Sequence, residues 1–356
     1  MVFVPLAIFV FGSASAVLSA STPKDPVRLR DLVKRGGTVT GPVLPLNFAD
    51  PGLILPNGRA PWYVYSTSSS HGKVPYAISE DFKTWTGVKG DALPNPGSWV
   101  SPSNSAVWAP DVRQITSNSY VMYYTAFSAA NGNHCIGAAT SSTPAGPFNP
   151  QASPIVCDAS GGGVIDASGF EAPGGTLYLV WKVDGNSMGK STPIFIQPLG
   201  ANGYTLQGKA TQLITNDPVD GGIVEAPSLV YWDGFYYLFF SSNHYNTLKY
   251  DVSYAISKSV TGPYTKVQAP HAPLLVSGKC GTAGPGGATV INVLGESPTF
   301  SLMNGCGTLT IFEPIQDKYI NAVFHNDING KNVSAGRSMW QISDLTLSNG
   351  IATVNC

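Results

Sequence analysis

Short runs of apolar and aromatic residues recur along the chain, separated by polar segments rich in glycine and proline. Runs of this length, bounded by turn residues, are typical of β-strands. The first four start about sixty residues apart, which indicates a repeated structural unit. The runs are WYVYSTS from Trp62, YVMYYTAF from Tyr120, LYLVWKV from Leu177, FYYLFFSS from Phe235 and a weaker LTIFEPI from Leu309.

A second strand pattern follows each aromatic run. It begins at Tyr76, Ile136 and Tyr254, and more loosely at Ile194. Residues 142–148 and 259–264 share a Gly-Pro-aromatic turn, two repeats apart. The repeat predicts an all-β fold, a five-bladed β-propeller whose innermost strands line a central channel. A β-sandwich built from generic strands is the alternative.

Composition agrees with short strands and tight turns, since the chain has 39 Gly and 28 Pro in 356 residues. Charged residues make up 12% and the formal net charge is −1. Because nucleic-acid binding needs a basic surface, this balance argues against a nucleic-acid partner. It suits a neutral partner such as a carbohydrate.

The N-terminus has the pattern of a secretory signal, with an apolar core over residues 2–10 and small residues after it. We predict a signal peptide over 1–20 and a pro-segment or an ordinary solvated leader over 21–35. Residues 36–356 then form a single propeller domain. No apolar run is long enough to span a membrane, so the protein is expected to be secreted and not membrane-bound.

Five cysteines fit an oxidising compartment. Proximity in sequence predicts that Cys135 pairs with Cys157 and Cys280 with Cys306. Cys356 would remain as a free thiol or join a different pairing. Asn332 begins an N-glycosylation sequon.

Four acidic residues precede the aromatic strands by similar distances. Successive members are 61, 55 and 59 residues apart. If the repeat is a blade, one blade position carries a carboxylate four times, and the four acids meet at one mouth of the channel. Like charges crowded there raise the pKa of one carboxyl, which suits acid-catalysed glycosidic cleavage. The acids are Asp50, Asp111, Asp166 and Glu225.

From about Asn47 onward the chain resembles glycoside hydrolase family 43, which degrades arabinan and xylan. The resemblance rests on FADPGLI, WAPDV, IDASGF, VEAPSLV, SEDFKTW and SKSVTGPY. It implies a five-bladed propeller that hydrolyses glycosidic bonds with inversion. It also implies that Asp50 is the general base, Glu225 the general acid and Asp166 the residue that modulates the pKa of the acid. Asp111 receives a substrate-binding or structural role.

Other side chains near the acids are candidates for sugar binding. Phe48, Trp108 and Phe170 adjoin the carboxylates and could stack on sugar rings, or they could pack between blades. His244 follows the fourth aromatic strand and could reach substrate, although a lone histidine is more often structural.

No metal or other cofactor is predicted with certainty. Many members of family 43 carry a Gly-Pro-Gly-His motif whose histidine helps hold an axial calcium. Here the stretch ends in Gly287. His325 matches a different recurrent histidine and does not replace the missing one.

The favoured function is the cleavage of α-L-arabinofuranosyl linkages in plant cell-wall polysaccharides by a monomer. A β-xylosidase or another pentoside hydrolase on the same fold is the alternative. A non-catalytic carbohydrate-binding propeller is the third hypothesis, against which the presence of all three carboxylates argues.

Overall fold

The computed structural model describes residues 37–294, 318–328 and 336–356, and Gly36–Cys356 forms one compact unit. The predicted signal peptide, the 21–35 segment, the strand from Leu309, Cys306 and the sequon at Asn332 lie outside the described residues. None of the helices in the described part has the length and apolar content needed to cross a membrane.

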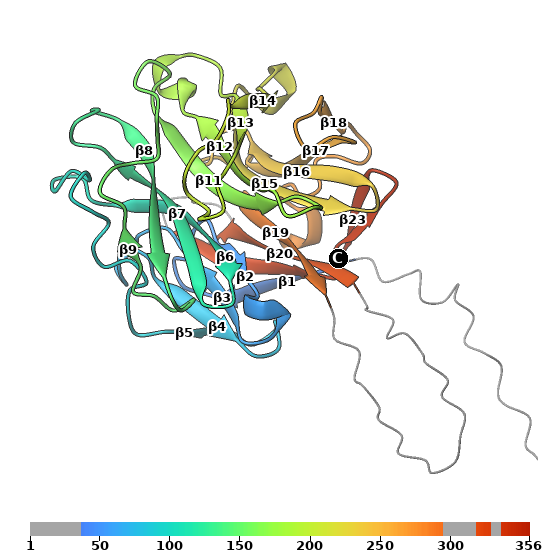
Figure 1. The fold of residues 1–356 in the computed structure, drawn as a ribbon. Coiled ribbons are helices and arrows are strands. Elements are labelled where there is room, and N and C mark those ends of the chain that lie inside the picture. Colours follow the sequence, from blue (N-terminus) through green and yellow to red (C-terminus); the bar gives the residue numbers. More distant parts are fainter. Residues whose placement is uncertain (1–36, 295–317, 329–335) are drawn as a thin grey trace, which may run out of the picture. The chain divides into compact units, whose positions relative to one another are not determined.

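Four sheets follow one another along the chain, and we call them blades one to four (Figure 1). In each, every strand pairs antiparallel with the next, except that in blade two β9 and β10 both pair with β8. Blade one contains β2 (Gly52–Ile54), β3 (Trp62–Tyr65), β4 (Tyr76–Ser79) and β5 (Thr86–Gly87). Blade two contains β6 (Val107–Thr116), β7 (Ser119–Phe127), β8 (His134–Ser141), β9 (Asn149–Pro150) and β10 (Val156–Cys157).

Blade three contains β11 (Val164–Glu171), β12 (Leu177–Val183), β13 (Ile194–Pro198) and β14 (Thr211–Ile214). Blade four contains β15 (Val224–Trp232), β16 (Phe235–Ser242), β17 (Asp251–Ser257) and β18 (Thr265–Lys266). The described helices are single 3₁₀ turns at Pro56–Gly58, Gly185–Met188, Pro218–Asp220 and Lys279–Gly281.

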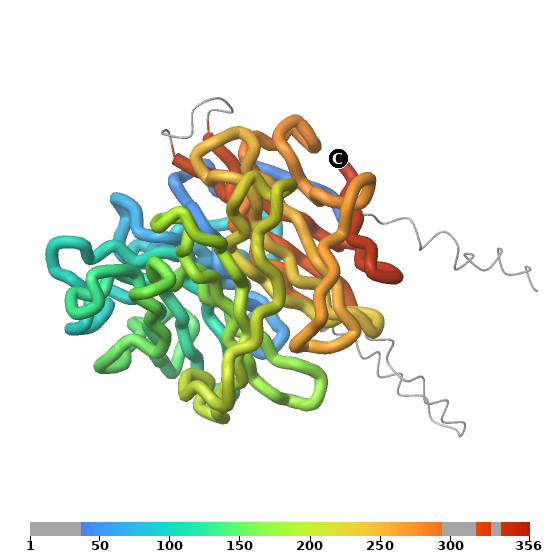
Figure 2. Tube along the Cα trace, turned by 90° about the horizontal axis from the view of Figure 1, so that it is seen from above, coloured from blue at the N-terminus to red at the C-terminus, as the bar shows by residue number. Residues whose placement is uncertain are grey.

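Blade five closes the ring with both ends of the described chain. Its strands run in the order β19, β20, β21, β1, β23, β22. The N-terminal strand β1 pairs antiparallel with β21 and parallel with β23, and Figure 2 shows it among the red C-terminal strands. The bounds are β19 (Gly286–Leu294), β20 (Lys318–Asp327), β21 (Arg337–Ser343), β1 (Gly37–Leu44), β22 (Thr346–Ser348) and β23 (Ile351–Asn355).

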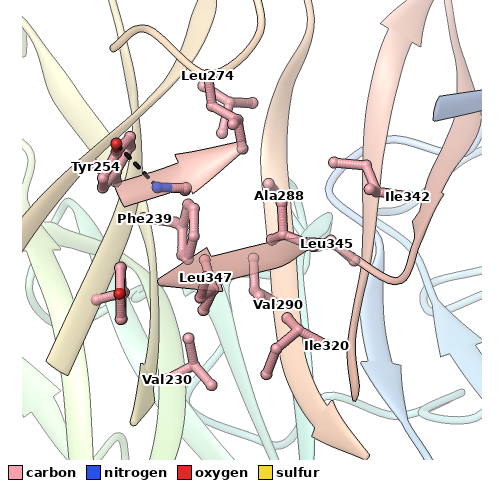
Figure 3. Close-up of a cluster of buried hydrophobic side chains, with 14 of the residues drawn as sticks. Val230, Phe239, Tyr254, Leu274, Ala288, Val290, Ile320, Ile342, Leu345 and Leu347 are labelled. Carbon is pink, nitrogen blue, oxygen red and sulfur yellow. Dashed lines mark hydrogen bonds between the residues drawn. The ribbon is translucent and has the colours of Figure 1, made fainter. Parts of the chain in front are cut away.

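The first strand of each blade lies at the centre of the ring. β2, β6, β11, β15 and β19 neighbour one another in that order, and β19 returns to β2. The hydrophobic core is divided into clusters between adjacent blades. Figure 3 shows the cluster in which Phe239 and Tyr254 of blade four face Ala288, Val290 and Ile320 of blade five. This all-β, five-bladed propeller confirms the predicted fold.

The aromatic runs form the second strand of each of the first four blades, as predicted: β3, β7, β12 and β16. The segments that follow them form the third strands β4, β8, β13 and β17. In blade five the second strand is β20, which begins at Lys318, nine residues after the start of the segment predicted from Leu309. Aromatic and branched side chains suit these strands because both faces pack against neighbouring blades.

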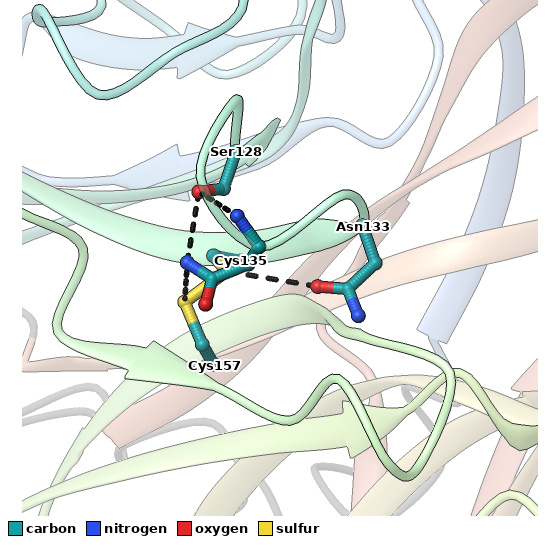
Figure 4. Close-up of a disulfide and its surroundings, with 5 residues drawn as sticks. Ser128, Asn133, Cys135 and Cys157 are labelled. Atoms are coloured by element: carbon teal, nitrogen blue, oxygen red, sulfur yellow. Dashed lines mark hydrogen bonds between the residues drawn. A yellow bond between two sulfur atoms is a disulfide. The ribbon is translucent and has the colours of Figure 1, made fainter.

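The structure confirms one predicted disulfide and corrects the other. Cys135 of β8 faces Cys157 of β10 and is bonded to it (Figure 4). Cys280 is bonded to Cys356, with the two Cα atoms 4.6 Å apart, so the predicted pairing with Cys306 is wrong. Proximity in sequence failed here because β1 closes blade five and brings the C-terminal strand beside the loop that precedes β19.

Candidate active site

Each inner strand is preceded or interrupted by one residue with a positive φ. In β6, β11, β15 and β19 the strand bulges at this residue, and the pairing of the inner strand with the second strand shifts register. Asp50 takes the equivalent place two residues before β2, whose pairing with β3 is regular. We call these five positions the bulge residues. They are Asp50 (φ 50°), Ala109 (φ 42°), Asp166 (φ 58°), Ala226 (φ 52°) and Gly287 (φ 57°).

The bulge residues correct the predicted phase of the acids. Asp50 and Asp166 occupy equivalent bulge positions, but Glu225 lies one residue before its bulge residue and Asp111 two residues after. Glu225 pairs with Ser241 in blade four, and Trp108 pairs with Thr125 at the same point of blade two. Trp108, and not Asp111, is therefore the equivalent of Glu225 in blade two. The prediction of one blade position with four carboxylates is therefore wrong, because spacing along the chain does not detect offsets of one or two residues.

Three of the four acids nevertheless line one small cavity. A cavity of about 30 Å³ is bounded by Asp50, Asp111 and Asp166 together with the bulge residues Ala109 and Gly287. Glu225 adjoins it, because the backbone N–H of the next residue, Ala226, donates to Asp166 Oδ2 at 2.9 Å. The structure thus brings all four predicted acids together around one cavity.

A side chain from the preceding blade, in or just after its second strand, accepts the N–H of four of the five bulge residues. We call these residues the capping residues. A buried bulge N–H without such an acceptor would lower the free energy of unfolding by about 1–3 kcal/mol. The bonds are Ala109 N–H to Thr67 Oγ1 (2.9 Å), Asp166 to Thr125 Oγ1 (3.1 Å), Gly287 to Ser241 Oγ (2.9 Å) and Asp50 to His325 Nδ1 (3.1 Å).

The carboxylate of Asp50 is held in its ionised form. Its Oδ2 accepts a 2.6 Å hydrogen bond from Thr67 Oγ1, and its Oδ1 lies 3.2 Å from Nδ1 of the buried His325. Burial acts to raise the pKa of Asp50, but His325, the charge of Arg337 and the Thr67 hydroxyl outweigh it and lower the pKa to about 2. Its side chain is 28% exposed, so Asp50 is an ionised carboxylate that solvent can reach.

Glu225 is buried and bonded on both oxygens. Lys182 Nζ donates to Oε2 at 2.9 Å and the Tyr250 hydroxyl donates to Oε1 at 2.8 Å. The adjacent Asp166 behaves differently: burial and the charge of Glu225 raise its pKa well above the ordinary value, although Lys182 opposes this. Two neighbouring carboxyls in such different surroundings favour a pair that carries one proton in the neutral range.

Asp111 has a structural environment. It is 6% exposed, and its Oδ2 accepts the backbone N–H of Gly169 in blade three at 2.8 Å. Burial raises its pKa to about 6. Ser228 makes the same bond to Val290 N–H between blades four and five. Asp111 therefore joins two inner strands at the wall of the cavity.

The predicted ring-stacking residues separate into two groups. Trp108 is partly exposed beside the mouth and stacks on His134, with ring centroids 3.9 Å apart. Phe48 (3% exposed) and Phe170 (6%) are buried in hydrophobic clusters, and Phe170 packs edge-on against Tyr236. Phe170 also lines a different cavity, at the other ends of the inner strands. The structure does not bring these two rings to the acids.

His244 lies in the β16–β17 loop and is exposed, and its carbonyl accepts bonds from Thr247. This loop follows the end of β16 that pairs with Glu225, so it stands at the same mouth. The neighbouring Tyr245 stacks on Arg337, with the guanidinium 4.8 Å from the ring centroid.

The residues at the mouth do not fit the axial calcium that the resemblance implies. Gly287 offers no side-chain ligand, and a Cβ there would lie 2.8 Å from His325 Nδ1 and 2.9 Å from Asp50 Oδ1. Among residues 37–294, 318–328 and 336–356, no group of three or more His, Cys, Asp or Glu side chains could hold a metal ion.

Sequence reasoning missed several side chains that hold the acids. They lie near the end of a second strand or start the third, away from the acidic motifs. The aligned second strands could have shown two of them, Thr67 and Lys182, since every capping residue is polar. The missed residues are Thr67, Lys182, Tyr250 and Arg337.

A five-bladed propeller with carboxylates of contrasting pKa at one channel mouth is the arrangement of a glycoside hydrolase. The sequence profile of glycosyl hydrolases family 43 matches residues 39–303, and the chain belongs to this family.

Similar proteins agree with this assignment. An extracellular endo-α-(1→5)-L-arabinanase 1 of Bacillus subtilis is 28% identical over 261 residues, covering 68% of this chain and 76% of that protein. A β-D-galactofuranosidase of Aspergillus niger is 29% identical, covering 63% of this chain and 65% of that protein. The crystal structure of a thermostable family-43 glycoside hydrolase superposes with a TM-score of 0.70 at 23% identity, covering 91% and 95% of the two chains.

Proposed function

We propose that this glycoside hydrolase cleaves α-L-arabinofuranosyl linkages in plant cell-wall arabinan or arabinoxylan, with inversion at the anomeric carbon. The observation that carries the proposal is that Asp50, Asp166 and Glu225 meet around one cavity, where the pKa of Asp50 is lowered and the pKa of Asp166 is raised. An inverting hydrolase needs one carboxylate to activate water and one carboxylic acid to protonate the leaving oxygen.

Asp50 acts as the general base. Its lowered pKa keeps it ionised, and its partial exposure lets a water molecule reach it. The Thr67 hydroxyl donates to the carboxylate and holds it in place, while His325 Nδ1 accepts the backbone N–H of the same residue. A fixed carboxylate can then remove a proton as the water attacks the anomeric carbon.

Glu225 acts as the general acid and Asp166 modulates it. The pair must carry one proton, and Glu225 must hold this proton when it reaches the glycosidic oxygen. Asp166 is fixed by the Ala226 N–H, so its carboxyl stays beside Glu225 throughout the cycle. Asp111 supports the wall of the site through Gly169.

Trp108 provides a flat apolar face for a sugar ring at the mouth, with His134 packed behind it. His244 is placed in a loop at the same mouth, where it can contact a longer substrate. Sugars combine apolar ring faces with hydroxyl rims, which fits an aromatic platform beside polar side chains.

The substrate assignment follows the relatives. The Bacillus relative is an arabinanase, and the Aspergillus relative acts on β-D-galactofuranosides, as its name states. Both names denote furanosides, so furanosides are favoured over β-xylosides. The extracellular location of the Bacillus relative also supports secretion of this chain, which we propose acts as a monomer.

The test is a substrate panel of arabinan, arabinoxylan and nitrophenyl arabinosides, xylosides and galactofuranosides, with wild type and Glu225→Ala. Wild type should act best on an arabinofuranoside. Loss of a general acid typically costs 10²–10⁴-fold, and the loss should be smaller for nitrophenyl substrates because their leaving groups need less protonation. Equal activity of mutant and wild type on every substrate would exclude Glu225 as the acid.

A further inference from the structure

The capping residues show one break in their fivefold pattern. In blades one, two, four and five the capping residue is Thr67, Thr125, Ser241 or His325, and each accepts a bulge N–H. In blade three the equivalent residue is Lys182, which faces Ile165 in the ladder as Ser241 faces Glu225. An ammonium group has no lone pair and cannot accept a hydrogen bond.

The break has a direct consequence for Asp166. The bulge N–H that Lys182 fails to accept belongs to Ala226, and Asp166 Oδ2 accepts it instead at 2.9 Å. Of the two carboxylates at bulge positions, only Asp166 takes over the bond that a capping residue makes elsewhere. This bond fixes the carboxyl of Asp166 next to the residue that follows Glu225.

The ammonium group of Lys182 is bonded to Glu225. Its side chain is 0% exposed, and Nζ lies 2.9 Å from Glu225 Oε2 and 2.9 Å from Asp184 Oδ1. Burial acts to lower the pKa of Lys182, but Glu225, Asp184 and Asp166 raise it, so the ammonium stays charged. A buried cation so placed favours the ionised forms of the carboxyls around it.

We propose that Lys182 is a positioning residue of the reaction, which fixes Glu225 and limits the Asp166–Glu225 pair to a single proton. The inference rests on the proposed function, because it assigns Lys182 to the acid side of that mechanism. Lys182 replaces a neutral capping residue with a cation at the one junction where both carboxyls of the pair meet.

Other charged groups also face the pair, and the direction of the effect includes them. Asp50 raises the pKa of Asp166 and Lys182 lowers it. Asp184 is bonded to Lys182 and offsets part of the charge that Lys182 presents to the pair. Without the ammonium, the pair holds its proton to higher pH. The titratable groups that face the pair are Asp50, Lys182, Asp184, Tyr250 and His325.

The deciding variant is Lys182→Thr, which introduces the residue type found in blades one and two. Threonine can accept the Ala226 N–H, so the fold of the junction is preserved while the charge is lost. We expect the alkaline limb of the pH profile of kcat/KM on a nitrophenyl α-L-arabinofuranoside to move up by about one pH unit or more. Lys266→Met removes a lysine on the outermost strand β18 and serves as the matched control, with no shift expected.

Asp184→Asn gives a second test with the opposite sign. It removes an anion whose side chain is only 16% exposed and leaves Lys182 in place, so the alkaline limb should move down. The proposal is overturned if the alkaline limb of kcat/KM stays at the wild-type pH in both variants while both keep wild-type thermal stability. This holds even if kcat falls.

A carboxyl ¹³C NMR titration of the Asp166–Glu225 pair in wild type and Lys182→Thr gives a readout that needs no activity. The pair should titrate at higher pH in the variant, and identical titrations would overturn the proposal. If wild type cleaves no glycoside of the panel, the proposed function fails, while the titration still decides the role of Lys182.

Discussion

At the residue scale, environment separates the acids more than residue type does. Asp50 and Asp166 are both aspartates at bulge positions, yet the pKa of one is lowered to about 2 and the pKa of the other is raised. The first is bonded to Thr67 and lies near His325 and Arg337, while the second faces Glu225. The same backbone position thus supports an ionised carboxylate in one blade and, in another, a carboxyl with a raised pKa beside Glu225.

Asp166→Asn should make the stability of the protein less sensitive to pH. A carboxyl with a raised pKa binds its proton more tightly in the folded chain than in the unfolded chain, where the pKa is about 4. Stability therefore falls as the pH rises from about 4 toward the folded value. Calorimetry should show a steeper fall in Tm between pH 5 and pH 8 for wild type than for the variant. Parallel curves would show that Asp166 does not carry the raised pKa.

The three main acids could be found from sequence because each lies in a short motif next to a strand. Whether these acids occupy equivalent positions in their blades could not be predicted from sequence. A bulge changes the pairing register by one residue without changing the local composition, so the offset of Glu225 from Asp166 is visible only in the ladder. Lys182 was missed because its partner Glu225 comes from another blade.

At the scale of the elements, the bulge and its cap join one blade to the next and position the base. Thr67 makes both connections: its Oγ1 accepts the Ala109 N–H and donates to Asp50 Oδ2. Thr125 makes only the first kind of bond, to the Asp166 N–H, among the contacts of the described residues.

Thr67→Val should weaken the fold and also alter the base. An unbonded Ala109 N–H costs about 1–3 kcal/mol of unfolding free energy, measurable by denaturant titration. Loss of the donated bond raises the pKa of Asp50, so the acidic limb of kcat/KM should move to higher pH. The control Thr125→Val should lose similar stability without moving that limb. A shift of equal size in both variants would mean that the Thr67 hydroxyl does not act on Asp50.

The second and third strands of four blades could be predicted, since their aromatic pattern is local. Phe48 and Phe170 could not be assigned from sequence, because a phenylalanine beside an acid has the same pattern whether it faces a sugar or a neighbouring blade. The structure shows the second arrangement for both residues.

At the scale of the whole molecule, the ring of blades is closed by β1, and a disulfide links the two ends of the C-terminal part of blade five. β1 pairs with β21 and β23, and Cys280 is bonded to Cys356 at the C-terminal end of the last strand. This closure could not be predicted from sequence, because it joins residues from opposite ends of the chain.

Cys356→Ser should destabilise the protein more than Cys135→Ser. The Cys280–Cys356 bond spans 76 residues and the Cys135–Cys157 bond spans 22. In the chain-entropy account the longer loop contributes about 1 kcal/mol more. Urea unfolding of the two variants measures the difference. A larger loss in Cys135→Ser would contradict the chain-entropy account of the two disulfides.

The most direct test of the central claim is proton NMR of the first sugar released from an α-L-arabinofuranoside by the wild-type protein. If Asp50 activates water while Glu225 protonates the leaving oxygen, cleavage is a single displacement and the first product is the β anomer. Release of the α anomer first would require a covalent intermediate and would contradict the assignment of Asp50 as the base.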